Sequence, residues 1–135
     1  MRYLAIDYGF KRTGLAICDP NETIASPLMV IEGQKDLLNK IRQVITAENV
    51  EAVVIGLPLN MDDSRGPQAK LVFRFADQLR EQLHLPVHFQ DERLSTFGAA
   101  EKLNSAELSR KKKAKRLDAV AAAEILEAFL EEKKT

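Results

Sequence analysis

Three acidic residues stand at points of this chain where a reactive site could form. Asp7 ends the apolar run that begins at Arg2, Glu92 follows a second short apolar run, and Asp118 follows a basic segment. A carboxylate that leaves a buried strand is costly unless it is hydrogen-bonded, paired or bound to a cation. If the strands before Asp7 and Glu92 are parallel neighbours, all three acids can meet at the carboxyl ends of the sheet.

Carboxylates gathered in this way repel one another, so they need a cation. Oxygen ligands suit Mg²⁺ or Mn²⁺. Two such ions about 3.5–4 Å apart can clamp the attacking and leaving oxygens of a phosphodiester. The pattern indicates metal-dependent phosphodiester hydrolysis, with Asp7, Glu92 and Asp118 as the catalytic and metal-binding residues.

Basic residues lie close to these acids in the sequence. Residues 110–116 read RKKKAKR, without an acid, and two more basic residues follow the first strand. Such segments bind backbone phosphates, and lysines do so as point charges that position the backbone without reading bases. We expect the run to be a loop, because its like charges repel. Nucleic-acid binding is assigned to Lys11, Arg12, Asn60, Arg110, Lys111, Lys112, Lys113, Lys115 and Arg116.

Each feature also has a simpler interpretation. Asp7 could cap the turn that follows it, and Asp118 could be a first-turn acid favoured by the helix dipole. Glu92 could pair with Arg93 or Lys102 at the surface, and the basic run could be a solvated loop. The case for a site depends on three acids at element ends occurring together with one basic segment.

The spacing of apolar residues predicts the elements that must position these side chains. Continuous apolar runs predict five strands, over Arg2–Asp7, Thr13–Cys18, Thr23–Ile31, Ala52–Gly56 and Leu85–Gln90. Helical spacing predicts helices over Lys35–Glu48, from Pro67 to Leu83, from Ser95 or Thr96 to about Asn104, and over Leu117–Glu132. A helix before the fourth strand indicates a parallel crossover, and Pro27 indicates an edge strand or a bulge. The fold class is therefore α/β with a mixed five-stranded sheet.

Length and composition set wider limits. A chain of 135 residues predicts one domain over residues 1–135, and its net charge of zero does not indicate a partner. The single cysteine, Cys18, excludes an internal disulfide and suits a reducing compartment. No signal-like segment and no run of membrane-spanning length occurs. We therefore expect a cytoplasmic protein without a membrane partner. The sequence does not determine the oligomeric state, for which a monomer is favoured.

Four blocks occur in a specific order along nearly the whole chain: IDYGFKRTGLAICD from Ile6, VVIGLPLNMDDSRGPQA from Val53, DERLST from Asp91, and SRKKKAKRLDAVAA from Ser109. With these blocks the chain resembles the YqgF/RuvX family of proposed pre-16S rRNA nucleases, which are related to Holliday junction resolvases. The resemblance implies a ribonuclease H-like three-layer fold with helices on both faces of the sheet. It also implies a divalent-metal nuclease whose acids match Asp7, Glu92 and Asp118. Its expected role is 5′-end maturation of pre-16S rRNA during ribosome biogenesis.

Two alternatives remain, a resolvase-like endonuclease on branched DNA and a non-catalytic RNA-binding assembly factor. Nothing in the sequence separates RNA from DNA, because backbone contacts do not report the 2′-hydroxyl. Related resolvases carry a fourth acid where this chain has Ala121, so we expect weak Mg²⁺ or Mn²⁺ binding. A kinase or ATPase of the actin-like superfamily would need two such domains, and 135 residues supply one.

Overall fold

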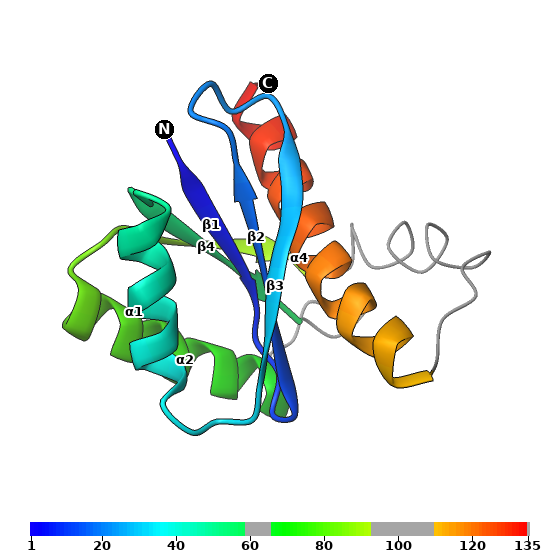
Figure 1. Cartoon of the computed structure of the whole chain (residues 1–135). Helices are drawn as coiled ribbons and strands as arrows, with labels where there is room; N and C mark the ends of the chain where they lie inside the picture. Colours follow the sequence, from blue (N-terminus) through cyan, green and yellow to red (C-terminus); the bar gives the residue numbers. More distant parts are fainter. Residues whose placement is uncertain (59–65, 93–109, 135) are drawn as a thin grey trace.

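The computed structural model describes residues 1–58, 66–92 and 110–134, with the backbone alone for 110–117 (Figure 1). Five strands and three helices follow one another along these segments. They are β1 (Tyr3–Asp7), β2 (Arg12–Cys18), β3 (Ala25–Glu32), α1 (Leu37–Ala47), β4 (Ala52–Leu57), α2 (Pro67–Leu83), β5 (Val87–Asp91) and α4 (Arg110–Lys134).

The five strands form one mixed sheet in the order β3-β2-β1-β4-β5. Strand β1 is antiparallel to β2 and parallel to β4, and β4 is parallel to β5. The predicted mixed sheet and parallel crossover are therefore confirmed. Strand β3 lies at the edge, and its pairing with β2 has a bulge next to the pair Ala16–Pro27. This is where a residue without a backbone N–H is tolerated.

Helices cover both faces of the sheet, as expected. Figure 1 shows α1 and α2 on one face and α4 on the other. Successive side chains of a strand point to opposite faces. Accordingly Leu4 and Ile6 pack in the core beneath α1 and α2, whereas Tyr3 and Ala5 pack against α4.

Helix α4 begins seven residues earlier than predicted. The basic run was expected to be a loop before a helix at Leu117, but the helix extends from Arg110 to Lys134. Lysine, arginine, alanine and leucine all have high helix propensity. Because nucleation is the costly step, a helix already formed against the sheet extends easily into a neighbouring segment. The predicted helix ending near Asn104 lies outside the described residues.

Two strands are shorter than predicted, for reasons of hydrogen bonding. Strand β3 begins at Ala25 because the backbone N–H groups of Thr23 and Ile24 donate to the Asp19 carboxylate, each at 2.7 Å. Strand β5 begins at Val87 because Pro86 has no N–H to donate. In the described part of the chain, no helix is both long enough and apolar enough to cross a bilayer.

Candidate active site

Asp7 and Glu92 meet at the carboxyl ends of the parallel strands. Asp7 is the last residue of β1, and Glu92 comes directly after β5. Since β1 and β5 both run parallel to β4, these ends lie at the same edge of the sheet. The two carboxyl groups are hydrogen-bonded to each other.

This contact changes the protonation of Asp7. Burial is the main cause that raises the pKa of Asp7, to about 9. The hydrogen bond with Glu92 and the negative charges of Glu92 and Asp118 raise this pKa further. At neutral pH Asp7 therefore keeps its proton within this hydrogen bond, which lowers the negative charge at this end of the sheet.

Two glycines make room for this arrangement on either side of β1. Gly14 of β2 pairs with Asp7, and a Cβ at Gly14 would overlap with the backbone carbonyl of Asp118. Gly56 of β4 lies one residue beyond the Ile6–Ile55 pair. A Cβ there would lie 2.7 Å from Cγ of Glu92. Gly14 thus leaves space for the backbone of α4, and Gly56 leaves space for the side chain of Glu92.

The importance of Gly56 was missed in the sequence. The sequence does contain a feature that indicates its role, because Gly56 ends the buried β-branched run of β4. A glycine in a strand often marks a close approach of another group. Gly9, in the turn after β1, also lies against backbone, because a Cβ there would overlap with the carbonyl oxygen of Arg12.

Asp118 is paired with a residue that was predicted to bind nucleic acid. Nε of Arg12 donates to Oδ2 of Asp118 at 2.9 Å, and both side chains are partly buried. Asp118 is the ninth residue of α4, so it cannot be the first-turn acid of the simpler interpretation. It is instead brought against β2, where Arg12 and Gly14 both contact it.

The three acids therefore lie at one end of the sheet, on the face covered by α4. No group of three His, Cys, Asp or Glu side chains in the described residues is arranged as a set of metal ligands. In this state a proton on Asp7 and the guanidinium of Arg12 offset the negative charge. All the donor atoms are carboxylate oxygens, the type that Mg²⁺ and Mn²⁺ prefer. The chemical type of the donors therefore suits such an ion, whereas their arrangement in this state, with a proton on Asp7 and Arg12 paired to Asp118, does not.

The other predicted nucleic-acid residues are only partly described. Lys11 is exposed in the turn between β1 and β2. The backbone of residues 110–116 forms the first two turns of α4, and this end of the helix lies at the same end of the sheet as that turn (Figure 1). Asn60 lies outside the described residues.

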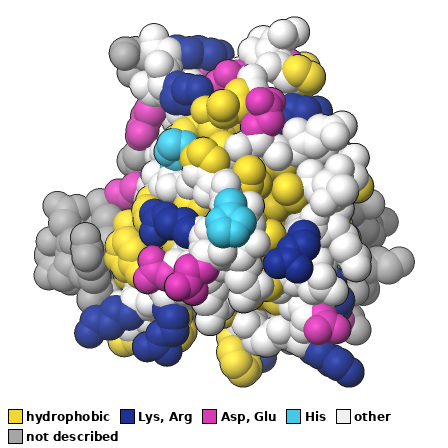
Figure 2. All heavy atoms as spheres, turned by 90° about the vertical axis from the view of Figure 1, so that its left-hand side faces the viewer, with side chains coloured by type: hydrophobic (Ala, Val, Ile, Leu, Met, Phe, Trp, Pro, Cys, Tyr) yellow, Lys and Arg dark blue, Asp and Glu magenta, His cyan; other side chains and the backbone are white. Residues whose placement is uncertain are grey.

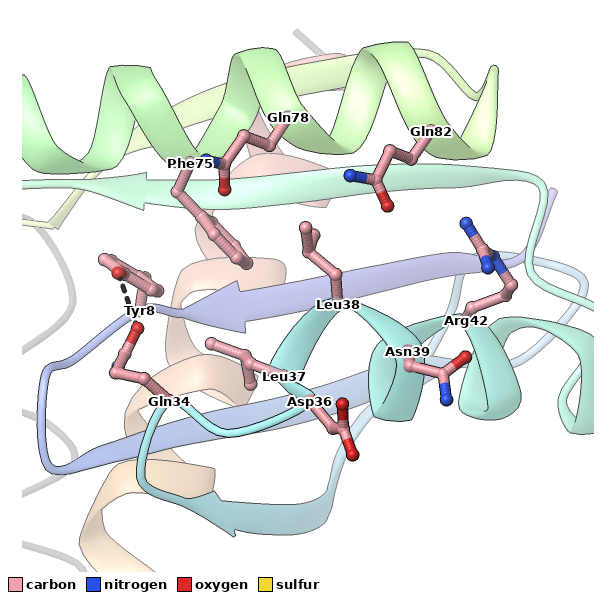
Figure 3. A pocket seen from close by; sticks show the side chains of 10 residues that line it. All are labelled: Tyr8, Gln34, Asp36, Leu37, Leu38, Asn39, Arg42, Phe75, Gln78 and Gln82. Atoms are coloured by element: carbon pink, nitrogen blue, oxygen red, sulfur yellow. Dashed lines mark hydrogen bonds between the residues drawn. The ribbon is translucent and has the colours of Figure 1, made fainter.

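The face of the sheet covered by α1 and α2 carries a hollow but none of the three acids. A hollow of about 400 Å³ between α1 and α2 is lined by residues such as Tyr8, Gln34, Arg42 and Phe75, and by none of the three acids (Figure 3). On the side that carries these helices, basic and acidic side chains are interspersed (Figure 2). Among the described residues, that side offers no continuous basic surface for a phosphate backbone.

Comparison with known proteins identifies the family. The family model described as "RuvX: Holliday junction resolvase" matches residues 1–132. The chain belongs to the RuvX family. Two relatives, from Caldanaerobacter subterraneus and Geobacillus kaustophilus, are each 40% identical to this chain over 137 and 138 residues. Both are named "Putative pre-16S rRNA nuclease", and the alignments cover 99% of this RuvX-family chain and 99% and 100% of theirs.

Solved structures confirm the predicted ribonuclease H-like fold. RuvC from T. thermophilus in complex with a Holliday junction substrate has a TM-score of 0.60 at 14% identity, covering 99% of this chain and 96% of its own. The Fowlpox virus resolvase in complex with Holliday junction DNA has a TM-score of 0.62 at 12% identity, covering all of both chains. At these identities the likeness concerns the fold alone.

Proposed function

We propose that this chain is a divalent-metal-dependent nuclease that hydrolyses phosphodiester bonds, with residues 1–135 as one nuclease domain. Asp7, Glu92 and Asp118 are its catalytic and metal-binding residues. One observation carries the proposal. Carboxylates from three distant segments gather at one end of the sheet, where a proton and an arginine compensate their charge.

Each residue has a role that follows from its position. Bound Mg²⁺ or Mn²⁺ supplies the charge that activates water and stabilises the leaving oxyanion. Asp7 must give up its proton to act as a ligand, so its raised pKa links activity to pH. If Asp118 were to hold a metal ion, its partner Arg12 would be available for the phosphate of the substrate. Its planar guanidinium matches two phosphate oxygens at once.

The proposed substrate is the 5′ region of pre-16S rRNA, processed in the cytoplasm during ribosome biogenesis. The names of the relatives support this substrate, because the similarity extends over nearly the whole of each chain. The basic start of α4 supports a nucleic-acid partner. Lysine and arginine side chains add positive charge that attracts backbone phosphates. The same end of α4 lies beside the acids through Asp118.

A second candidate is endonuclease activity on branched DNA. The family description and the fold of the resolvase complexes favour it. The acids and the basic run would serve both substrates equally, since phosphate contacts do not distinguish them.

Cleavage assays on a pre-16S rRNA fragment and on a four-way DNA junction test both candidates. Each substrate is incubated with Mg²⁺, with Mn²⁺ or with EDTA. Wild type should cleave only with a metal ion, and Asp7→Asn should lower the rate more than about 100-fold. The expected loss is this large because mutating a residue that only orients a metal ligand already lowers metal affinity or activity about 10–100-fold. Asp77→Asn is the matched control, because Asp77 is an exposed acid on α2, and its activity should equal that of wild type.

The preferred substrate decides between RNA and DNA. Equal cleavage by wild type and Asp7→Asn would place the chemistry elsewhere. Tight binding of the RNA without cleavage in either metal would favour the assembly-factor alternative.

A further inference from the structure

The turn between β1 and β2 presents an exposed aromatic side chain three residues after Asp7. Phe10 is 80% exposed, more than any other large hydrophobic residue in the described part of the chain. A single exposed hydrophobic residue is common and needs no explanation by itself. Phe10 differs from such residues because hydrogen bonds from elsewhere in the chain fix its backbone.

This turn is fixed at three successive carbonyl groups. Nε2 of Gln34 donates to the carbonyl oxygens of Gly9, at 2.9 Å, and of Phe10, at 3.0 Å. The backbone N–H of Gly33 donates to the carbonyl oxygen of Lys11 at 2.8 Å. Polar groups in an ordinary surface turn are left largely to water. Here Gly33 and Gln34, which follow β3, donate hydrogen bonds to all three carbonyl groups. The backbone that carries Phe10 is therefore held in a defined position.

The support continues into the core. The hydroxyl of Tyr8 donates to Oε1 of Gln34 at 2.9 Å, which fixes the amide that holds the turn (Figure 3). The ring of Tyr8 stacks on that of Phe75, with centroids 4.2 Å apart and planes 15° apart. Phe75 is a buried residue of α2. A chain of contacts therefore connects the hydrophobic core to the backbone of Phe10, while the Phe10 ring itself remains in solvent.

The surroundings of Phe10 suit one kind of ligand. Lys11 is exposed beside it, and a shallow hollow of about 600 Å³ next to the turn is lined by Phe10, Lys11, Arg12, Glu32, Gly33 and Gln34. An aromatic ring next to cations is the combination that binds single-stranded nucleic acid, the ring stacking on a base and the cations holding phosphates. Each stacked base changes affinity by about fivefold to a hundredfold.

The distance to the acids is short. Three residues span at most about 11 Å, so the backbone of Phe10 lies within one or two nucleotides of Asp7. A base in a continuous duplex has both faces covered by its neighbours and could not use this ring. A nucleotide released from pairing could.

We propose that Phe10 is a stacking platform for an unpaired base of the substrate, one or two nucleotides from the phosphate at the acidic site. The inference rests on the proposed nuclease function and narrows its substrate. The site takes a single-stranded or locally opened segment, with Lys11 on the adjoining phosphate.

Binding measurements in a cleavage-deficient background test the platform. The full chain carrying Asp7→Asn is titrated, in EDTA, with a fluorescent single-stranded oligonucleotide and with its fully paired duplex. Adding Phe10→Ala should weaken single-strand binding about 10-fold and leave duplex binding unchanged. Phe10→Trp should restore the affinity, whereas Phe10→Leu, apolar but without a π face, should not. The melting temperature should stay constant, since the side chain is exposed.

A base analogue gives a direct reading. The fluorescence of 2-aminopurine within the single strand should be quenched by the Phe10 protein and much less by Phe10→Ala. Equal affinities for Phe10, Phe10→Ala and Phe10→Leu would overturn the platform, as would equal losses on single strand and duplex. Its failure is separable from that of the nuclease. Metal-dependent cleavage with no effect of Phe10→Ala removes the platform alone, and stacking without any cleavage by wild type removes the nuclease alone.

Discussion

The two faces of the sheet are packed in different ways. Beneath α1 and α2 the buried side chains are mostly large, including Leu4, Ile55, Phe75 and Leu79. Beneath α4 the strands and the helix contribute mostly small residues, namely Ala5, Ala16, Cys18, Ala52, Ala122 and Ala123. The large residues bury more apolar area, and the small ones bury less.

This difference shows what each face provides. Small residues let the backbone of α4 approach until the carbonyl of Asp118 fills the space above Gly14. That approach brings the Asp118 carboxylate to Arg12 and within electrostatic reach of Asp7. The α1–α2 face buries the larger side chains, and the α4 face supplies the geometry of the candidate site. Four experiments test this division, from the largest expected effect to the smallest.

The largest effect should come from removing the buried acid of the α4 face. The pKa of Asp7 is raised to about 9 in the folded protein, so the folded state keeps a proton that the unfolded chain loses above about pH 4. Wild-type stability should therefore fall as the pH rises from about 5 to 8 because of this group. Asp7→Asn removes this loss while keeping a donor to Glu92. It should be more stable than wild type by a few kcal/mol at pH 7, with the gain vanishing near pH 4.

Urea unfolding at several pH values, in EDTA, measures this gain. Asp19→Asn is a control of opposite sign. The hydroxyl of Thr23 and the backbone N–H of Ile24 lower the pKa of Asp19, so its stabilisation is present above about pH 4 and is lost on acidification. Asp19→Asn should destabilise the protein at neutral pH and make no difference in acid. A pH-independent gain for Asp7→Asn would show that Asp7 is not protonated in the fold.

The next effect concerns the close approach of α4. Gly14→Ala should destabilise the protein by about 3 kcal/mol, because the added Cβ overlaps with the backbone of Asp118 and α4 must shift. The shift should also abolish the rise in melting temperature that saturating Mn²⁺ gives wild type by mass action. Thermal unfolding with and without Mn²⁺ measures both.

Leu79→Ala provides the matched control on the other face. Leu79 is a fully buried residue of α2, and its truncation should cost about 2–5 kcal/mol through lost burial and a cavity. The rise in melting temperature with Mn²⁺ should persist in Leu79→Ala, because this change does not move any of the three acids. If Gly14→Ala and Leu79→Ala both keep the Mn²⁺-dependent rise in melting temperature, or both lose it, the two faces do not have the separate roles proposed here.

A smaller effect is expected from the basic start of α4. Lys112, Lys113 and Lys115 changed together to alanine should flatten the log–log salt dependence of nucleic-acid binding by about 2–3 units. Each phosphate contact contributes about 0.7–0.9. The loss should be the same for all sequences, and Mn²⁺ binding should persist. Binding at several salt concentrations measures the slope.

An equal charge removed from the opposite face serves as the control. Lys40, Lys70 and Arg74 are exposed on α1 and α2, where charges of both signs are interspersed (Figure 2). Changing these three to alanine should leave the slope nearly unchanged. Similar slopes for the two triple variants would mean that net charge alone matters and that the start of α4 has no special role.

The smallest effect tests the competition between Arg12 and a metal ion. Nε of Arg12 occupies Oδ2 of Asp118, so Arg12→Met should raise Mn²⁺ affinity several-fold, or by about 1 kcal/mol, as for a partly exposed ion pair. Isothermal titration with Mn²⁺ measures the affinity directly. A weaker affinity in Arg12→Met would instead mean that Arg12 orients Asp118 for the ion.

Much of this architecture was already determined by the sequence. Apolar runs and helical spacing predict the five strands and the parallel crossover, because burial imposes its own period on each element. Pro27 predicts an edge strand or a bulge through its missing donor, and β3 has both. The candidate acids could also be named in advance, because Asp7 and Glu92 stand where a strand leaves the core and Asp118 adjoins the basic run.

The contacts that make the acids into a site were decided only by the tertiary structure. Arg12 and Asp118 are 106 residues apart, and no local pattern predicts that an arginine assigned to phosphate binding pairs with an acid of the site. The Asp7–Glu92 hydrogen bond and the fit of Glu92 over Gly56 likewise join different strands. Charge repulsion alone predicted a loop for the basic run, but propagation from the packed part of α4 makes it helical. Local periodicity reports which face of an element is buried, whereas the partner across that face depends on how distant segments pack.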